Sequence, residues 1–233
     1  MNFQTKISLL SILITFNIYA QKDSTIKMGV GIGINYTFWN VNKNDLNQHN
    51  AAYHGIDLSN STIALNTTAT PSPFIKLYFE NGSRKKIKFF TAINLFYSKL
   101  LYQQNAETFI SSPSGSYKKT SRFNYTISPI HANVELGPHF NIGHFYSRTG
   151  LNIDFIYLNE RIEGSSIDSG MNEKTTNIKE SSFAIAGGAG ITIGYNFTIK
   201  TVPIYWEFKT AYSLCSYSKA NIMNSSTHLG IKF

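Results

Sequence analysis

The sequence predicts an all-β protein: an eight-stranded, antiparallel, up-and-down transmembrane β-barrel preceded by a cleaved signal peptide. Three observations lead to this fold. Apolar residues alternate with period two in eight segments. The connections alternate between short and long, as in bacterial outer-membrane barrels. The face opposite the large apolar residues carries Gly and Ala in two strands and mixed charges in others.

The N-terminal segment, residues 1–20, is predicted to be a secretory signal peptide. Lys6 gives a positive start, the run "ISLLSILITF" is apolar but too short to span a bilayer, and Ala20 is a suitable cleavage residue. A buried first helix is the alternative. Residues 21–233 are then an exported domain, expected in the outer membrane.

The composition limits the classes of protein that are possible. Charged residues make up 15% and aromatic residues 14% of the 233 residues, and no later run is long and apolar enough for a membrane helix. The single cysteine, Cys215, excludes an internal disulfide framework. The formal charge is +8, but the basic residues are scattered, so nucleic acid is not an expected partner.

The expected strands follow one another with alternating connections. Short turns, "NGSR", "NIGH" and "TIKTV", follow the second, fourth and sixth strands, whereas polar loops follow the first, third and fifth. The short turns are expected at the periplasmic rim and the long loops outside the cell. The strands are expected at 26–38, 71–81, 86–103, 119–140, 145–162, 177–196, 202–217 and 222–233.

The faces of the first and sixth strands decide which side meets lipid. Ile32 lies among outward large residues and Gly31 among small ones; in the sixth strand Ile191 opposes Gly190. A strand face in water should carry long polar side chains, because Gly and Ala weaken strands. A narrow eight-stranded lumen, in contrast, needs small residues opposite large ones. The apolar face is therefore predicted to point outward to lipid.

The fifth and seventh strands follow the same alternation. Leu151, Ile153, Phe155 and Tyr157 are expected outside in the fifth, and Val202, Ile204, Trp206, Phe208 and Tyr212 in the seventh. In the fourth strand the large residues change from odd positions such as Tyr125 to even positions such as Ile130. Because Pro129 lies at the change and a bulge inserts one residue, a β-bulge is predicted at Pro129.

The opposite face places ionisable residues in the lumen. Charges of both signs predict a filled, ion-paired interior, since buried charges require partners; a path for a polar solute or for protons is the alternative. The predicted lumen residues are Lys76, Glu80, Lys88, His131, Glu135, Arg148, Asp154, Glu207, Lys209 and Lys232. Aromatic residues expected in membrane-interface girdles are Tyr36, Phe38, Trp39, Tyr195, Phe197 and Trp206.

The last strand ends on "HLGIKF", with Leu229, Ile231 and Phe233 on one face. Together with "YAQ", the Gly-rich "KMGVGIGINY" and "ISPIHANVELG", this ending resembles the PorT-like family of small outer-membrane barrels of Bacteroidota, over about residues 25–233. The resemblance implies that these three residues form the signal read by the barrel-assembly machinery. Most members have no known function, and one is implicated in type IX secretion.

Catalytic and cofactor motifs are weak. The glycine repeats lie within strands and not at a helix start, so they do not predict nucleotide binding. His139 and His144 flank a turn without further ligands at metal spacing. His131, Ser128 and Glu135 are the nearest set to a lipid A deacylase site, but two of them are expected in the lumen. The protein is therefore predicted not to be an enzyme and to need no cofactor or metal.

The predicted role is structural or surface-interacting, with outer-membrane lipid around the barrel and an extracellular or envelope protein contacting loop 39–70. An accessory role in secretion or transport across the outer membrane is the alternative, and a lipid A-modifying enzyme is the third. A soluble lipocalin-like barrel, with the same geometry but apolar inside, is also kept open.

Overall fold

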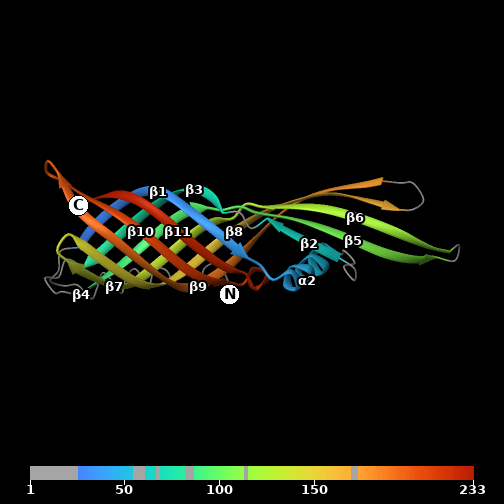
Figure 1. Ribbon diagram of the computed structural model, residues 1–233, viewed down its shortest axis with the longest axis horizontal. Helices are drawn as coiled ribbons and strands as arrows, with labels where there is room; N and C mark the ends of the chain where they lie inside the picture. Colours follow the sequence, from blue (N-terminus) through green and yellow to red (C-terminus); the bar gives the residue numbers. More distant parts are fainter. Residues whose placement is uncertain (1–25, 55–60, 67–68, 82–86, 113–114, 169–172) are drawn as a thin grey trace.

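A computed structural model describes residues 26–54, 61–66, 69–81, 87–112, 115–168 and 173–233. The molecule is elongated, with a barrel at one end and a narrower sheet extending from it (Figure 1). The predicted signal peptide and most of the "NGSR" turn lie outside the described residues. The elements are β1 (Ile26–Asn40), α2 (Lys43–His54), β2 (Ser61–Asn66), β3 (Thr70–Asn81), β4 (Ile87–Tyr97), β5 (Leu100–Ser112), β6 (Gly115–Ile127), β7 (Ile130–Ile142), β8 (Phe145–Asp168), β9 (Glu173–Ile199), β10 (Val202–Cys215), η1 (Tyr217–Lys219) and β11 (Asn221–Lys232).

Eight of these strands close into a ring. Neighbours pair antiparallel in the order β1–β3–β4–β7–β8–β9–β10–β11, and β11 pairs with β1 to complete the cylinder. The Phe233 amide donates to the Met28 carbonyl at 2.8 Å and seals this seam. Gly143, at φ 63°, allows the tight predicted turn between β7 and β8. The eight-stranded barrel is confirmed.

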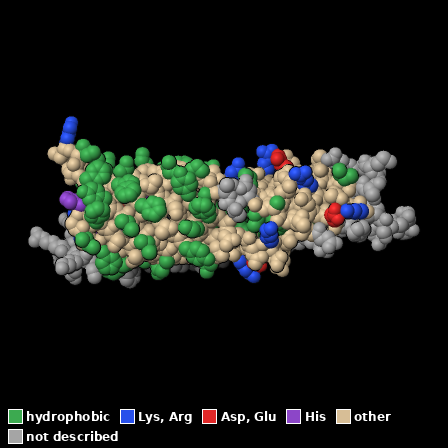
Figure 2. Space-filling view, viewed as in Figure 1, with side chains coloured by type: hydrophobic (Ala, Val, Ile, Leu, Met, Phe, Trp, Pro, Cys, Tyr) green, Lys and Arg blue, Asp and Glu red, His purple; other side chains and the backbone are tan. Residues whose placement is uncertain are grey.

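The orientation of the side chains is also as predicted. Ile32, Ile191 and Phe208 are 68, 52 and 47% exposed, whereas the Lys209 residue is 4% exposed. Figure 2 shows apolar side chains gathered over the barrel and charged ones mainly over the narrower sheet beyond it and at the ends. A closed barrel with an apolar exterior and an ionic interior is stable only in a membrane. The protein is an outer-membrane barrel.

Glycines in the lumen make room for large side chains. A Cβ atom on any of three glycines would overlap a tyrosine ring from a neighbouring strand. This small-against-large packing fills the interior of a narrow barrel. The pairs are Gly29 with Tyr78, Gly230 with Tyr205, and Gly194 with Tyr146.

The two largest differences from prediction are the hairpins beyond the barrel. The segments 103–118 and 163–176, predicted as loops, are largely strand: β5 pairs with β6, and β8 with β9, far past the ring. β5 continues from β4 after residues 98–99, β6 leads into β7 through residues 128–129, and β2 pairs with the edge of β5. We call β2, β5, β6 and the outer parts of β8 and β9 (159–168 and 173–182) the extension.

The predicted bulge at Pro129 is wrong. Ile127 pairs with Glu160 and Ile130 with Tyr157, so two residues separate these pairs on both strands and no residue is inserted. Odd-numbered residues, including Tyr125, Ile127 and Pro129, stay buried across the junction. The odd-numbered positions point inward along both β6 and β7, but the medium outside changes. Lipid surrounds β7, so its large apolar residues are at outward positions. Water surrounds β6, so its large apolar residues are at inward positions.

Two smaller corrections concern residues 39–54. The sequence predicted no helix after the signal peptide, yet α2 forms, with the Asn42 side chain accepting from the Asn44 amide at 2.9 Å as an N-cap. None of the described helices is long and apolar enough to cross a membrane. Trp39 is not in a girdle but buried inside, whereas Tyr36, Phe38 and Trp206 do point outward.

Candidate functional site

Glu207 on β10 is the hub of a buried ionic network in the lumen. Its Oε2 accepts from Lys76 Nζ at 2.6 Å and lies 2.7 Å from His228 Nε2. Its Oε1 accepts from Arg148 Nη1 at 2.5 Å and from the Tyr146 hydroxyl at 2.6 Å. Four strands thus meet at one carboxylate. A buried charge that keeps several partners ties the opposite walls together.

Aromatic rings surround Arg148 and Lys232, on the side of Glu207 that faces the C-terminus. The Arg148 guanidinium lies 4.5 Å from the Tyr78 ring centroid and 4.8 Å from that of Tyr146. The Lys232 ammonium lies 4.8 Å from the same Tyr146 ring. Cations over ring faces are attracted by the ring quadrupole, and this attraction strengthens where water is excluded. The rings therefore plug the lumen while stabilising its charges.

Glu80 forms a second ionic group near this end. It accepts from Lys88 Nζ at 2.9 Å and lies 3.2 Å from His139 Nδ1. Arg148 Nε donates to His139 at 3.1 Å, which links this group to the hub. His139 thus belongs to the ionic network and does not meet His144 at a shared ion site. Among the described residues, no group of three or more His, Cys, Asp or Glu could hold a metal ion.

The middle of the lumen is spanned by Lys209. This lysine reaches from β10 to form an ion pair with Glu135 on β7. β7 and β10 are not neighbours in the ring, so the pair crosses the interior. The structure thus brings the predicted lumen residues together in connected groups that cross the interior of the barrel.

His131 lies in a Ser–His–Asp arrangement at the end of the lumen next to the extension, which we call the outer end. Its Nε2 is 2.9 Å from Ser98 Oγ and its Nδ1 is 2.8 Å from Asp154 Oδ2. These distances match those of hydrolytic triads. However, all three side chains are fully buried, Trp39 Nε1 donates to the same Ser98 oxygen at 3.1 Å, and the His131 ring stacks on Phe96. The serine is thus a hydrogen-bonded core residue without access for a substrate.

Sequence reasoning grouped His131 with Ser128 and Glu135, which the structure separates. Glu135 faces Lys209 deeper in the lumen, and Ser128, between β6 and β7, is at an even, outward position. Ser98 was not predicted here because the predicted lumen set contained ionisable side chains only, and serine is not ionisable. Its signal was its position: it shares the even-numbered inward phase with the buried Asn94 and Phe96 of β4.

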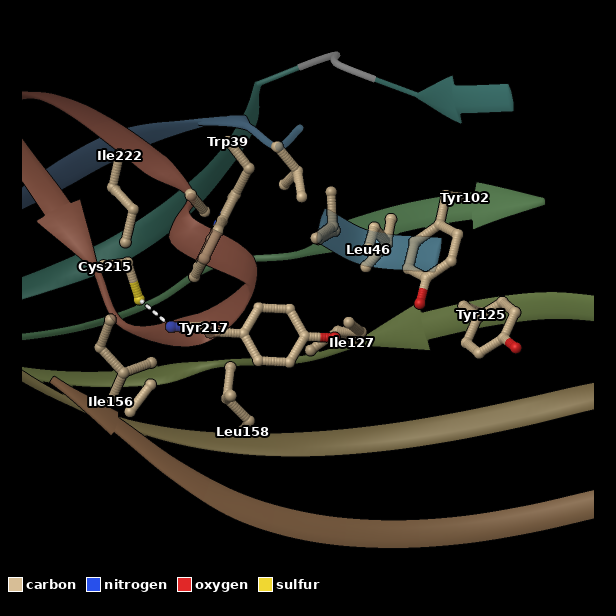
Figure 3. Packing of buried hydrophobic residues seen from close by; sticks show 14 of the residues in the cluster. Trp39, Leu46, Tyr102, Tyr125, Ile127, Ile156, Leu158, Cys215, Tyr217 and Ile222 are labelled. Atoms are coloured by element: carbon tan, nitrogen blue, oxygen red, sulfur yellow. Dashed lines mark hydrogen bonds between the residues drawn. The ribbon is translucent and has the colours of Figure 1, made fainter. Parts of the chain in front are cut away.

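An apolar cluster closes the outer end of the lumen (Figure 3). Tyr217 of η1 and Leu46 of α2 lie over side chains from the barrel and from the extension, and the rings of Tyr102 and Tyr125 stack with centroids 4.3 Å apart. The cluster also includes Trp39, Ile127, Ile156, Leu158, Cys215 and Ile222. Water would have to displace this cluster to reach the ionic lumen, so the barrel is sealed at this end.

The predicted contact loop, 39–70, is partly fixed to the extension. Asn50 Nδ2 of α2 donates to Gln104 Oε1 at 2.6 Å, and Tyr102 donates to Asn50 at 3.1 Å. Asn47 accepts from Gln104 and from Ser61 of β2. The described helix α2 is therefore fixed to β5 and β2 of the extension, while residues 55–60 and 67–68 lie outside the described residues.

Glu160 of β8 is a buried carboxyl group just above the junction with the barrel. Burial raises its pKa to about 7, and Glu180, its cross-strand neighbour, acts in the same direction, whereas Tyr217 opposes the shift. A carboxyl whose folded pKa is raised stabilises the fold at low pH and loses this contribution as pH rises from about 4.5 to about 7.

We therefore expect the base of the extension to be more stable at pH 5 than at pH 8, by on the order of a few kcal/mol. Amide hydrogen exchange of residues 157–163, corrected for the intrinsic pH dependence of exchange, measures this difference. Glu160→Gln should abolish it, while Glu163→Gln, on the exposed face of the same strand, should leave it intact. Equal protection at both pH values would contradict the assignment.

Comparisons with known proteins give structural similarity only. No protein-family model and no curated protein matches the sequence. Ail of Yersinia pestis, solved with the heparin analogue sucrose octasulfate, is 10% identical with a TM-score of 0.34, covering 89% of this chain and 99% of that one. Neisserial surface protein A is 10% identical (TM-score 0.36; 88% and 97% covered), and OprG of Pseudomonas aeruginosa is 9% identical (TM-score 0.38; 91% and 98% covered).

Proposed function

We propose that the protein is a non-enzymatic outer-membrane anchor that presents the extension to partners outside the cell. The observation that carries this proposal is the contrast between the two parts. The lumen is filled by ion pairs around Glu207 and covered by the apolar cluster, whereas the extension has buried apolar residues of its own and polar outer faces. A rigid scaffold that displays an elaborated end is a common design for recognition.

The position of the extension supports an extracellular role. The C-terminus and the short turn between β7 and β8 lie at the opposite end of the barrel (Figure 1). In bacterial barrels short turns face the periplasm and long segments face outward. The extension therefore projects beyond the outer leaflet.

The outer face of the extension is suited to polar contacts. Arg161 and Lys179 are exposed cross-strand neighbours on β8 and β9, and Asn124 on β6 is exposed on the same outer side of the sheet. Arg161 pairs with exposed Glu163 and Lys118 with exposed Glu107. Exposed ion pairs contribute little to folding, so these groups remain available to exchange partners. A partner with a hydrated, charged surface fits this face best.

The absence of catalysis is part of the proposal. Among the described side chains, Ser98, His131 and Asp154 are the set that we identify as a hydrogen-bonded nucleophile, base and orienting acid, and this set has no exposed atom for a substrate to approach. An enzyme acting on lipid would need its nucleophile on the outward face. The accessory role in secretion is supported by the sequence resemblance to PorT-like barrels and remains the second candidate.

Photo-crosslinking in intact cells tests the proposal. We expect a benzoylphenylalanine at Asn124 or Lys179 to give adducts of protein size, and the same probe at lipid-facing Ile191 to give none. Adducts with subunits of one large envelope complex would favour the secretion role. Adducts from neither extension position would contradict surface interaction through this sheet.

A further inference from the structure

Three side chains in the middle of the lumen have a geometry suited to covalent bond formation. Asn133 Oδ1 on β7 is 3.4 Å from Lys209 Nζ on β10. The same lysine nitrogen forms an ion pair with Glu135, two residues along β7 from Asn133. Asn94 Nδ2 on β4 donates to Asn133 Oδ1 at 3.1 Å. An amine, a carboxylate and a polarised carboxamide therefore meet at one point.

Burial makes this arrangement chemically different from a surface ion pair. Lys209 is 4% exposed, Glu135 3% and Asn133 2%, and the Glu135 Oε2 atom has no hydrogen-bond partner among the described residues. An ion pair kept from water is costly, and the direct contact places the Glu135 carboxylate where it can take a proton from Nζ. The neutral amine formed in that step is the nucleophilic form of lysine.

We propose that Lys209 and Asn133 form an intramolecular isopeptide bond across the lumen. Glu135 first takes one proton from the Lys209 ammonium, and the neutral Nζ attacks Cγ of Asn133, forming the new C–N bond. Protonated Glu135 gives its proton to Nδ2 as the Cγ–Nδ2 bond breaks, and ammonia leaves. The regenerated carboxylate then takes the extra proton from Nζ, which becomes the amide N–H, so Glu135 ends as the neutral acid. Atoms and electrons balance without an oxidant, a metal or a cofactor.

Each neighbour has a defined role in this step. Glu135 is the general base and then the general acid, a function that requires contact with the reacting nitrogen. Asn94 donates to the oxygen on which negative charge develops as Cγ becomes tetrahedral. The fixed walls hold the nucleophile close to the carbon bonded to Oδ1, and such positioning supplies a large part of the barrier reduction in intramolecular reactions.

A second lysine–asparagine pair in the lumen serves as a comparison for Lys209 and Asn133. Lys232 Nζ also donates to an asparagine, Asn196 Oδ1, but its described surroundings are tyrosine rings and it has no ion pair with a carboxylate among the described residues. Without an adjacent base this second pair is expected to stay unreacted. The modification would therefore occur once, between β7 and β10, and would covalently close residues 133–209 into a loop.

Mass spectrometry of the full chain purified from outer membranes tests the proposal, which is independent of the surface role. We expect loss of one ammonia, about 17 Da, and a cross-linked peptide pair containing Asn133 and Lys209 after proteolysis. After boiling, the linked chain should migrate faster than an unlinked one, because the closed loop stays compact.

Variants locate the chemistry. Glu135→Gln, which keeps the shape but removes the base, should show the separate peptides, while Glu80→Gln, the matched change in another buried ion pair, should keep the link. Heat-modifiability of both variants on a gel shows that they fold. Separate Asn133 and Lys209 peptides in the folded wild-type protein would overturn the proposal. So would ammonia loss mapped only elsewhere, such as at an N-terminal glutamine.

Discussion

Replacing Glu207 with alanine is expected to lower the free energy of unfolding by about 3–5 kcal/mol. The carboxylate has Lys76, Arg148 and His228 as partners, and all of these are buried. Removing it leaves the buried Lys76 and Arg148 without the carboxylate that contacts both of them. The uncompensated buried charge costs more free energy than the missing van der Waals packing of the shortened side chain.

Urea titration of the refolded protein in lipid vesicles, followed by the heat-modifiable band, measures this effect. The control is Glu107→Ala, because Glu107 pairs with Lys118 on the surface of the extension, where both side chains are about half exposed. This change is expected to cost less than about 1 kcal/mol. Similar midpoints for the two variants would show that the lumen is hydrated and that Glu207 is not desolvated.

Much of the barrel was predictable because alternation reports the faces of a strand directly. Gly31 and Gly190 would weaken a strand face exposed to water, so their face was predicted to line the lumen. The opposite face, with Ile32 and Ile191, was therefore predicted to face lipid. Mixed charges on the inward face then predicted pairing inside, and the structure places Glu207 and Arg148 together. Which carboxylate meets which cation depends on strand order and stagger, which alternation does not encode.

The extension was not predictable by the same rule, because the rule assumes one solvent along each strand. Tyr125 and Ile127 are large and apolar at odd positions, and a lipid-facing interpretation of them required a bulge before Ile130. In the structure the odd face is inward throughout, and the surrounding medium changes at residues 128–129. The hairpin 103–118 was predicted as a loop because its sequence is polar. Near the tip of a hairpin in water both faces of each strand are solvated, so polar residues show no alternation that would indicate a strand.

The second large effect is expected on the outward face of β8, where this change of medium can be measured. Leu151→Arg should lower the free energy of unfolding in vesicles by about 2–4 kcal/mol if the position lies near the bilayer midplane, and by less nearer an interface. Leu151 is 64% exposed, and its neighbours on the adjacent strands, Leu136 and Ala189, leave no polar partner for a guanidinium. The charge would have to enter hydrocarbon or distort the bilayer.

The matched control is Ile167→Arg on the same strand and the same face, 52% exposed but in the extension. There the guanidinium enters water, so the change is expected to alter the free energy by no more than about 0.5 kcal/mol. Vesicle refolding with the heat-modifiable band as readout applies to both variants. A large loss at Ile167 would place the extension in the membrane, and no loss at Leu151 would mean that the exterior of the barrel does not face lipid. The two substitutions together test where lipid gives way to water along β8, which is the boundary between the membrane anchor and the extension. Only such a change of solvent makes an arginine costly at position 151 and harmless at position 167.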